Sequence, residues 1–275
     1  MNTSTRLIGT AVALTLALTA APAWAASAWW HGVRSDNWKD GVSGGQSNWY
    51  SLAPPNGTAQ PVPDKTAKFA PGAKTFDVSI GAPTTVETMD FRSAPPRYTF
   101  TVTDTFSLTG KGVLNPFAIR PLFIVRAIMS FLNNSNTGFA DYEIKTAGTL
   151  TVDSTRGPAN NHLLQIGSVT NSGRFDVGQN TLRMRGDYQQ TAQGLLKFDK
   201  TNTVGGKIFG NHVTIAGEVV VEGRRALTPG RYLLIDAVTL VGKFTTANFF
   251  RFDTTKVKCT VVYENNNVVL VVTKK

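Results

Sequence analysis

Arginines are the residues whose type and spacing point most clearly to chemistry in this sequence, and that chemistry is anion binding. Arg183 and Arg185 are separated by one residue, so a strand would place both guanidinium groups on one face. Arg174 lies about half a repeat earlier, and Arg224 and Arg225 form a second basic pair. Guanidinium groups bind carboxylates, sulfates and phosphates through paired hydrogen bonds. These arginines are the candidate ligand-binding residues; the alternative is that they keep an outer face soluble and discourage edge pairing.

Signatures of catalysis and metal binding are absent from the sequence. The three histidines, His31, His162 and His212, are far apart and lack metal-ligand spacing. Cys259 is the single cysteine, which excludes an internal disulfide framework and a cysteine-cluster zinc site. No nucleophile elbow and no phosphate-binding glycine loop occurs. We therefore assign no catalytic residue, no metal and no cofactor.

Polysaccharide cleavage is the enzymatic alternative that the sequence leaves open. A hydrolase needs two acids at a defined separation, and a lyase needs a base beside a neutralising cation. The candidate acids are Asp176, Asp187, Asp199 and Glu218, and the candidate bases are Lys197 and Lys200. Stacked repeats would bring Asp176 and Asp199 onto neighbouring strands. A carboxylate cluster along a groove would favour an enzyme, whereas scattered carboxylates would argue against one.

The N-terminus is predicted to be a targeting segment. Arg6 precedes an apolar stretch at 7–21, and Ala23-Trp24-Ala25 fits the small-x-small pattern of signal peptidase sites. We predict a signal peptide at 1–25 and a mature domain at 26–275, although 26–28 also fits a cleavage site. The apolar stretch is too short for a membrane span of about 20 residues, and no membrane span is expected in the mature chain.

The formal net charge of +10 limits the choice of partners. Such a charge in a cytosolic protein would suggest nucleic acid. Behind an export signal, the expected partner is an acidic polysaccharide or a cell-surface glycan, and nucleic acid is not expected. The predicted location is outside the cell or on its surface, with the periplasm as an alternative.

Strands that follow a glycine recur along the chain and predict the fold. Gly148, Gly173, Gly194 and Gly217 each begin an alternating apolar and polar segment, at steps of 25, 21 and 23 residues. Such steps match one coil of a stacked solenoid. Leu150, Phe175, Leu195 or Phe198, and Val219 or Val221 would then form columns in a shared core. We predict an all-β parallel β-helix of eight to ten coils; an antiparallel sandwich is the competing fold.

Both ends of the predicted solenoid carry features that suit caps. Trp29, Trp30, Trp38 and Trp49 crowd a Trp-rich region at 26–70, where they would plug the open core or stack on sugars. At the other end, 245–275 supplies capping strands, with a hairpin at 260–272 around three asparagines. Near Pro121 we expect buried strands, with a short helix at 123–132 as the alternative.

Segment 138–244 resembles the passenger domain of bacterial autotransporters, proteins that display a pertactin-like β-helix outside Gram-negative cells. The matching runs are NNSNTGFADYEIKTAGTLTVDST, NSGRFDVGQNTLRMRGDYQQTAQGLL, and IAGEVVVEG followed by LTPGRYLLIDAVTLVGKF. The last run fits the pattern G-x-Y-x-L-I-x-A…G-x-F that ends many passengers, through Gly230, Tyr232, Leu234, Ile235, Ala237, Gly242 and Phe244. The tryptophan-rich start is also similar.

The resemblance implies a single-stranded right-handed parallel β-helix with autotransporter-associated strand repeats. No residues follow Lys275 for the C-terminal β-barrel translocator, so a passenger without its translocator is expected. The implied function is that of an exported, non-enzymatic, adhesin-like protein whose basic face binds anionic glycans or host surfaces, with outer-membrane association through partners. A polysaccharide lyase or hydrolase and a periplasmic envelope scaffold are the alternatives.

Overall fold

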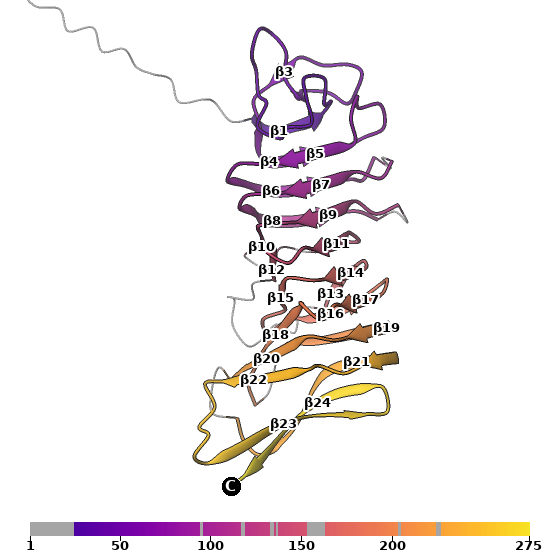
Figure 1. Ribbon diagram of the computed structural model, residues 1–275. Coiled ribbons are helices and arrows are strands. Elements are labelled where there is room, and N and C mark those ends of the chain that lie inside the picture. The colour runs from indigo at the N-terminus through magenta and orange to yellow at the C-terminus, as the bar shows by residue number, and fades with distance from the viewer. Residues whose placement is uncertain are drawn as a thin grey trace, which may run out of the picture.

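The protein is a β-solenoid of about seven turns (Figure 1). The computed structural model describes residues 25–93, 96–116, 119–132, 135, 137–152, 163–202, 205–223 and 227–275. In these ranges all regular structure is strand, so no helix there is long and apolar enough to cross a membrane. The all-β stacked architecture confirms the prediction and excludes the antiparallel sandwich. The expected eight to ten coils were too many, because the N-terminal loops and the C-terminal hairpin take up chain that adds no turns.

Two twelve-stranded sheets run the length of the solenoid. We call them sheet A and sheet B. Sheet A contains β1 (Ala25–Trp30), β2 (Trp49–Tyr50), β3 (Ala59–Gln60), β4 (Pro63–Lys68), β6 (Thr84–Asp90), β8 (Phe106–Leu114), β10 (Ile128–Phe131), β12 (Thr149–Val152), β15 (Arg174–Asp176), β18 (Leu195–Lys200), β20 (Glu218–Gly223) and β22 (Thr246–Phe250). From β4 to β22 its neighbouring strands pair in parallel, one rung per turn.

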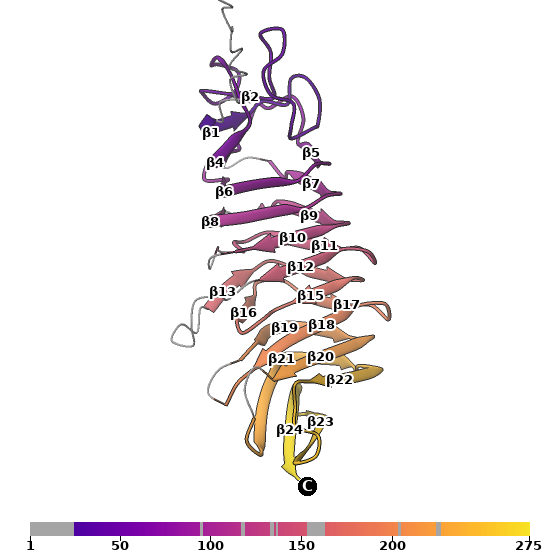
Figure 2. The same cartoon turned by 90° about the vertical axis from the view of Figure 1, so that its left-hand side faces the viewer.

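Sheet B faces sheet A across the core. It contains β5 (Asp77–Ile80), β7 (Thr99–Val102), β9 (Leu122–Val125), β11 (Asp141–Ile144), β13 (Leu163–Ile166), β14 (Val169–Asn171), β16 (Thr181–Met184), β17 (Tyr188–Gln190), β19 (Lys207–Ile215), β21 (Gly230–Gly242), β23 (Val257–Glu264) and β24 (Asn267–Lys274). A branch of this sheet, in which β13 pairs with β16 and β16 with the first half of β19, forms a third side of the solenoid (Figure 2).

The recurring glycines mark the start of successive rungs. Gly148, Gly173, Gly194 and Gly217 directly precede β12, β15, β18 and β20, which are neighbours in sheet A. Close packing between turns explains these glycines better than a need for left-handed backbone, since Gly217 alone among them has a positive φ. At Gly173 an added Cβ would lie 2.2 Å from the carbonyl oxygen of Lys145 and 2.3 Å from that of Gly148.

We expect Gly173→Ala to lower the free energy of unfolding by about 2 kcal/mol, because the backbone of two turns must move apart to admit a methyl group. Urea denaturation followed by circular dichroism measures the change. Gly41→Ala is the control, because its Cβ would meet no atom closer than 3.7 Å. Equal effects of the two substitutions would contradict the packing explanation.

Apolar side chains form continuous columns between the sheets. One column on sheet A consists of Leu150, Phe175, Leu196 and Val219, all fully buried and in register on four successive strands. Phe198 is also buried, as predicted, and it lies in register with Val221. Of the two alternatives, Leu195 or Phe198, the structure places Phe198 in the core. Leu195 is half-buried on the outer side of β18, because Leu196 and Phe198 already occupy the inward positions of this alternating strand.

Tryptophans close the N-terminal end of the core. The rings of Trp30, Trp38 and Trp49 are fully buried, with centroids 5.1 Å apart for Trp30 and Trp49 and 4.8 Å apart for Trp38 and Trp49. These three rings therefore plug the end of the solenoid core, and a sugar cannot reach them to stack. Trp29 is half-buried, and the Lys68 ammonium lies 5.4 Å from the centre of its ring.

The C-terminal hairpin forms where the sequence predicts it. Strands β23 and β24 pair antiparallel, and Asn265 and Asn266 adopt positive φ values of 45° and 62° in the turn. β24 also pairs antiparallel with β21, so the hairpin covers the last rung of sheet B. Near Pro121, β9 and β10 are strands with alternating buried residues, and the alternative helix at 123–132 does not form.

Buried side-chain amides connect adjacent turns in the middle of the solenoid. Asn171 Nδ2 donates a hydrogen bond to the Leu195 carbonyl at 3.0 Å. Gln190 Nε2 lies 2.8 to 2.9 Å from the carbonyl oxygens of Gly194, Ala216 and Glu218. Both amides are nearly inaccessible to solvent, so these bonds satisfy polar groups that would otherwise be unpaired.

Candidate binding groove

A groove of about 430 Å³ lies on the third side of the solenoid, where β16, β19 and β21 stack (Figure 2). Its lining residues are Arg183, Met184, Arg185, Phe209, Gly210, Asn211, Asp236, Ala237 and Val238. Met184 is buried, so its neighbours Arg183 and Arg185 both face outward into the groove. The groove therefore contains two of the five arginines singled out in the sequence.

Strand register sets the order of side chains along this side. Arg183 on β16 is in register with Gln165 on β13 and with Phe209 on β19. Phe209 is in turn in register with Asp236 on β21. Successive rungs are about 4.8 Å apart, so these four residues form a mixed column. An unbroken ladder of arginines does not form here, because glutamine and phenylalanine occupy the rungs on either side of Arg183.

The two groove arginines differ in how firmly the protein holds them. Arg185 Nε donates to Gln165 Oε1 at 3.0 Å, and its guanidinium lies 5.7 Å from the centre of the Phe139 ring. Across the described residues, no side-chain hydrogen bond or ion pair engages Arg183, Asn211 or Asp236. The polar groups of these three side chains are therefore available to a ligand.

Arg174 lies elsewhere, on β15 of sheet A. Its Nη2 is 3.4 Å from Asp176 Oδ2, and its neighbours in register are Thr149 and Leu195. Arg174 thus does not join the groove. Arg224 and Arg225 lie outside the described residues.

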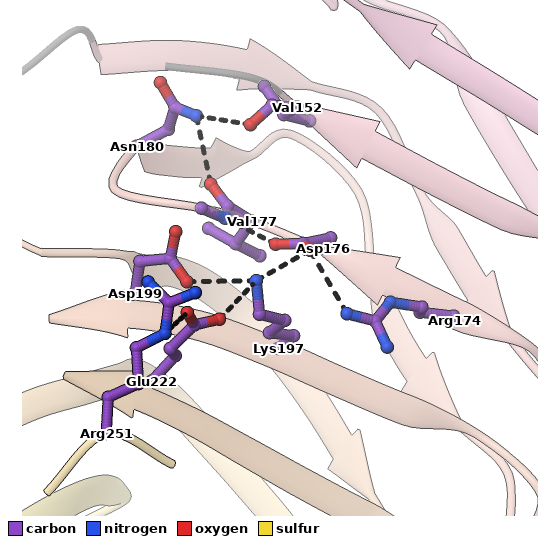
Figure 3. A network of polar contacts seen from close by, with 10 residues as sticks. Val152, Arg174, Asp176, Val177, Asn180, Lys197, Asp199, Glu222 and Arg251 are labelled. Atoms are coloured by element: carbon purple, nitrogen blue, oxygen red, sulfur yellow. Dashed lines mark hydrogen bonds and ion pairs between the residues drawn. The ribbon is translucent and has the colours of Figure 1, made fainter. Parts of the chain in front are cut away.

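A second polar cluster surrounds Lys197 on sheet A (Figure 3). Its Nζ lies 3.0 Å from an oxygen of Asp176, 3.1 Å from one of Asp199 and 3.1 Å from one of Glu222. Glu222 also pairs with Arg251 Nε at 2.9 Å. The structure therefore brings Asp176 and Asp199 together, as their spacing suggested, and it places Lys197 beside both of them. Glu222 was missed, although it follows Asp199 by 23 residues, the step that separates Gly194 from Gly217.

The electrostatics of this cluster suit a structural role. Burial disfavours the charged Lys197 ammonium, but the carboxylates of Asp176 and Asp199 outweigh burial and raise the pKa of Lys197. A lysine with a raised pKa holds its proton and is a poor general base. The Asp199 side chain is only 1% exposed, which leaves no space beside it for a sugar chain.

The other acids considered for catalysis are scattered. Asp187 is exposed just before β17, and Glu218 Oε1 accepts a hydrogen bond from Asn248 Nδ2 at 2.6 Å. Among the described residues that line the groove, Asp236 supplies the sole carboxylate. The two-acid arrangement that a glycoside hydrolase requires is therefore not found in the groove.

Lys200, the other lysine considered as a base, is enclosed by the protein. Its side chain is buried and its ammonium donates a hydrogen bond to the Leu233 carbonyl. Burial, together with the nearby charge of Lys207, lowers the pKa of Lys200 to about 7. A lysine in this setting makes the stability of the fold depend on pH, because folding changes its affinity for a proton.

Metal-binding groups do not cluster in the described part of the chain, where no three His, Cys, Asp or Glu side chains are placed to hold an ion. His31 stacks on Tyr50 with ring centroids 4.1 Å apart, and burial lowers its pKa. His212 is exposed on β19, and His162 lies outside the described residues. Burial raises the pKa of the Cys259 thiol, which makes it a weaker nucleophile.

Comparison with known proteins adds no relative. No protein-family model matches this chain, and no curated protein matches it at a significant level. The fold and the groove together define the class as a β-solenoid with a polar, partly basic groove on one side. The architecture is consistent with a β-helix passenger.

Proposed function

We propose that this protein is an exported, non-enzymatic binding protein that acts in the manner of an adhesin, as a passenger-like β-helix at the cell surface or outside the cell. Its ligand is an anionic glycan. The observation that carries this proposal is the exposure of Arg183 and Arg185 together in one groove. Guanidinium groups held on adjacent outward positions of a strand are suited to bind acidic groups along a chain.

Three further properties support a binding role. The groove volume of about 430 Å³ falls in the range of ligand sites in proteins. Stacked strands hold its walls, so binding requires little ordering of the protein. The net charge of +10 attracts anionic polymers over a screening length of about 8 Å at physiological salt.

The distribution of acids favours binding over cleavage. The three carboxylates that gather on sheet A share the protonated Lys197, and the groove contributes Asp236 alone. A cleaving enzyme would place an acid and a base or nucleophile on both sides of a bound sugar. Carboxylates therefore do cluster in this protein, but the cluster lies outside the groove. Its members are largely buried and pair with the Lys197 ammonium.

We expect Arg183→Ala combined with Arg185→Ala to weaken glycan binding about tenfold or more, because each charge-assisted hydrogen bond contributes about 1.5–3 kcal/mol. Binding of the purified mature protein to arrays of acidic and neutral glycans, over a salt series, measures the effect. Affinity for acidic glycans should fall as salt rises.

Arg126→Ala is the matched control, because Arg126 is an exposed arginine on the turn between β9 and β10, outside the groove. It should bind as the wild type does. Binding that ignores both salt and the groove arginines would contradict the proposed site. Failure to bind any glycan at low salt would overturn the proposed function and favour an envelope scaffold.

A further inference from the structure

We infer that the groove selects a linear glycan that carries one carboxylate per sugar, such as a uronate polymer, over a densely sulfated or phosphorylated chain. This inference rests on the proposed glycan-binding function and specifies the ligand of the same site. Its basis is the order of side chains on three successive rungs of the groove: a cation on Arg183, an aromatic ring on Phe209 and an anion on Asp236.

The three side chains lie in line along the solenoid axis. Because rungs are about 4.8 Å apart, the Cα atoms of Arg183 and Asp236 are about 10 Å apart, with Phe209 between them. A ligand that follows the groove along the axis therefore meets a positive, an apolar and a negative position in turn. A chain with several anions on each sugar would instead be matched by cations on every rung.

Phe209 is suited to the ring of a sugar. The side chain is on the outer side of β19 and is half-buried in the groove lining. One face of a pyranose ring consists of C–H groups, which pack against an aromatic ring and remove apolar surface from water. The Lys207 ammonium lies 5.3 Å from the centre of the Phe209 ring and adds positive charge beside this position.

Arg183 and the polar residues beyond Phe209 suit different groups of the ligand. The Arg183 guanidinium has no partner within the described chain, and a sugar carboxylate matches its two parallel N–H donors. An ionised Asp236 only accepts hydrogen bonds, so it requires a donor such as a sugar hydroxyl. Asn211 both donates and accepts, and it lines the same part of the groove.

Asp236 also explains why dense anionic charge is disfavoured. A chain with several sulfates on each sugar would place an anion beside the Asp236 carboxylate while another bound Arg183, and it would have few hydroxyl groups left to donate to Asp236. Like charges at such distances repel, and the unpaired carboxylate would lose hydration without gaining a donor. A uronate chain leaves hydroxyl groups for this position.

Calorimetric titration of the mature protein with three oligosaccharides of equal length tests the inference. The probes are an oligo-uronate, the neutral oligo-glucan and a fully sulfated oligosaccharide, all at physiological salt. We expect the oligo-uronate to bind at least about tenfold more tightly than the neutral chain, and no more weakly than the sulfated one. Tightest binding of the sulfated probe would overturn the inference.

Two substitutions separate the contributions of the groove. Phe209→Ala should weaken oligo-uronate binding about tenfold with an unchanged salt dependence, whereas Phe209→Tyr should retain binding. Asp236→Asn should strengthen binding of the sulfated probe by about threefold or more. Phe250→Ala is the matched control, because Phe250 is 54% exposed on β22, outside the groove.

The outcomes distinguish this inference from the proposed function. If none of the probes binds, both fail. If the sulfated probe binds best and neither Phe209→Ala nor Asp236→Asn changes the preference, glycan binding stands and the uronate inference fails. Thermal unfolding of each variant, compared with the wild type, shows whether a loss of binding reflects loss of the fold.

Discussion

Lys197→Met should lower the free energy of unfolding by about 3–5 kcal/mol at neutral pH, the cost of leaving buried charges without their partner. The Lys197 ammonium is the shared cation of Asp176, Asp199 and Glu222. Methionine has a similar length but no charge, so the three carboxylates would face one another. Urea denaturation of wild type and variant measures the difference.

The loss should shrink as the pH falls. Without the lysine, the three buried carboxylates repel one another, and this repulsion weakens as they bind protons at lower pH. Proton binding by the folded state stabilises it as the pH falls. The gap between wild type and variant should therefore be smaller at pH 5 than at pH 7.

Two comparisons test this explanation. Lys258→Met removes an exposed lysine of β23 and should change stability by less than about 0.5 kcal/mol. Adding Asp199→Asn to Lys197→Met should recover part of the loss, because it removes one of the unpaired charges. A Lys197→Met variant as stable as the Lys258→Met control would contradict the view that this cluster depends on its cation.

Lys200→Met should have the opposite effect and stabilise the protein at pH 7, by an amount on the order of 3 kcal/mol. The folded pKa of Lys200 is about 7, because burial and the charge of Lys207 disfavour its ammonium. The pKa of an unfolded lysine is about 10.4, so at neutral pH the unfolded chain carries this proton. Folding must then remove the proton or bury the ammonium, and either costs free energy. Methionine removes that cost and loses the hydrogen bond to the Leu233 carbonyl.

The advantage of this variant should depend on pH. Between about pH 7 and pH 10.4 the unfolded chain holds the Lys200 proton that the folded protein has lost, so wild-type stability rises with pH in this window. The variant lacks this rise. Urea denaturation at pH 6.5, 8 and 9.5 should show the two curves converging with pH, and parallel curves would contradict a buried, neutralised Lys200.

Local patterns in the sequence were sufficient to predict the fold. Alternation fixes which side chains of a strand face inward, and the regular steps from Gly148 to Gly217 mark one turn each. The number of turns was overestimated because the segment around Trp38 and the hairpin after β22 use chain without adding rungs. The three buried tryptophans were correctly favoured as a cap, since an open core end exposes apolar surface.

The groove could be predicted only in part. A separation of two residues places Arg183 and Arg185 on one face of any strand, so their shared location follows from local geometry. Which side of the solenoid a strand occupies depends on the turns before it, and for that reason Arg174 could not be assigned correctly. Phe209 and Asp236 join Arg183 through strand register, which alternation alone does not specify.

The short strands in the middle of the solenoid have a mechanical consequence. Backbone hydrogen bonds between rungs run along the long axis, so a force that pulls the two ends apart loads the rungs in series (Figure 1). In such a series the rung with the fewest bonds sets the strength. Strands β14, β15 and β17 have only three residues each, and here the amides of Asn171 and Gln190 bond across the turns. These two side chains add bonds between turns where the strands of both main sheets are short, and they strengthen the rod there against tension.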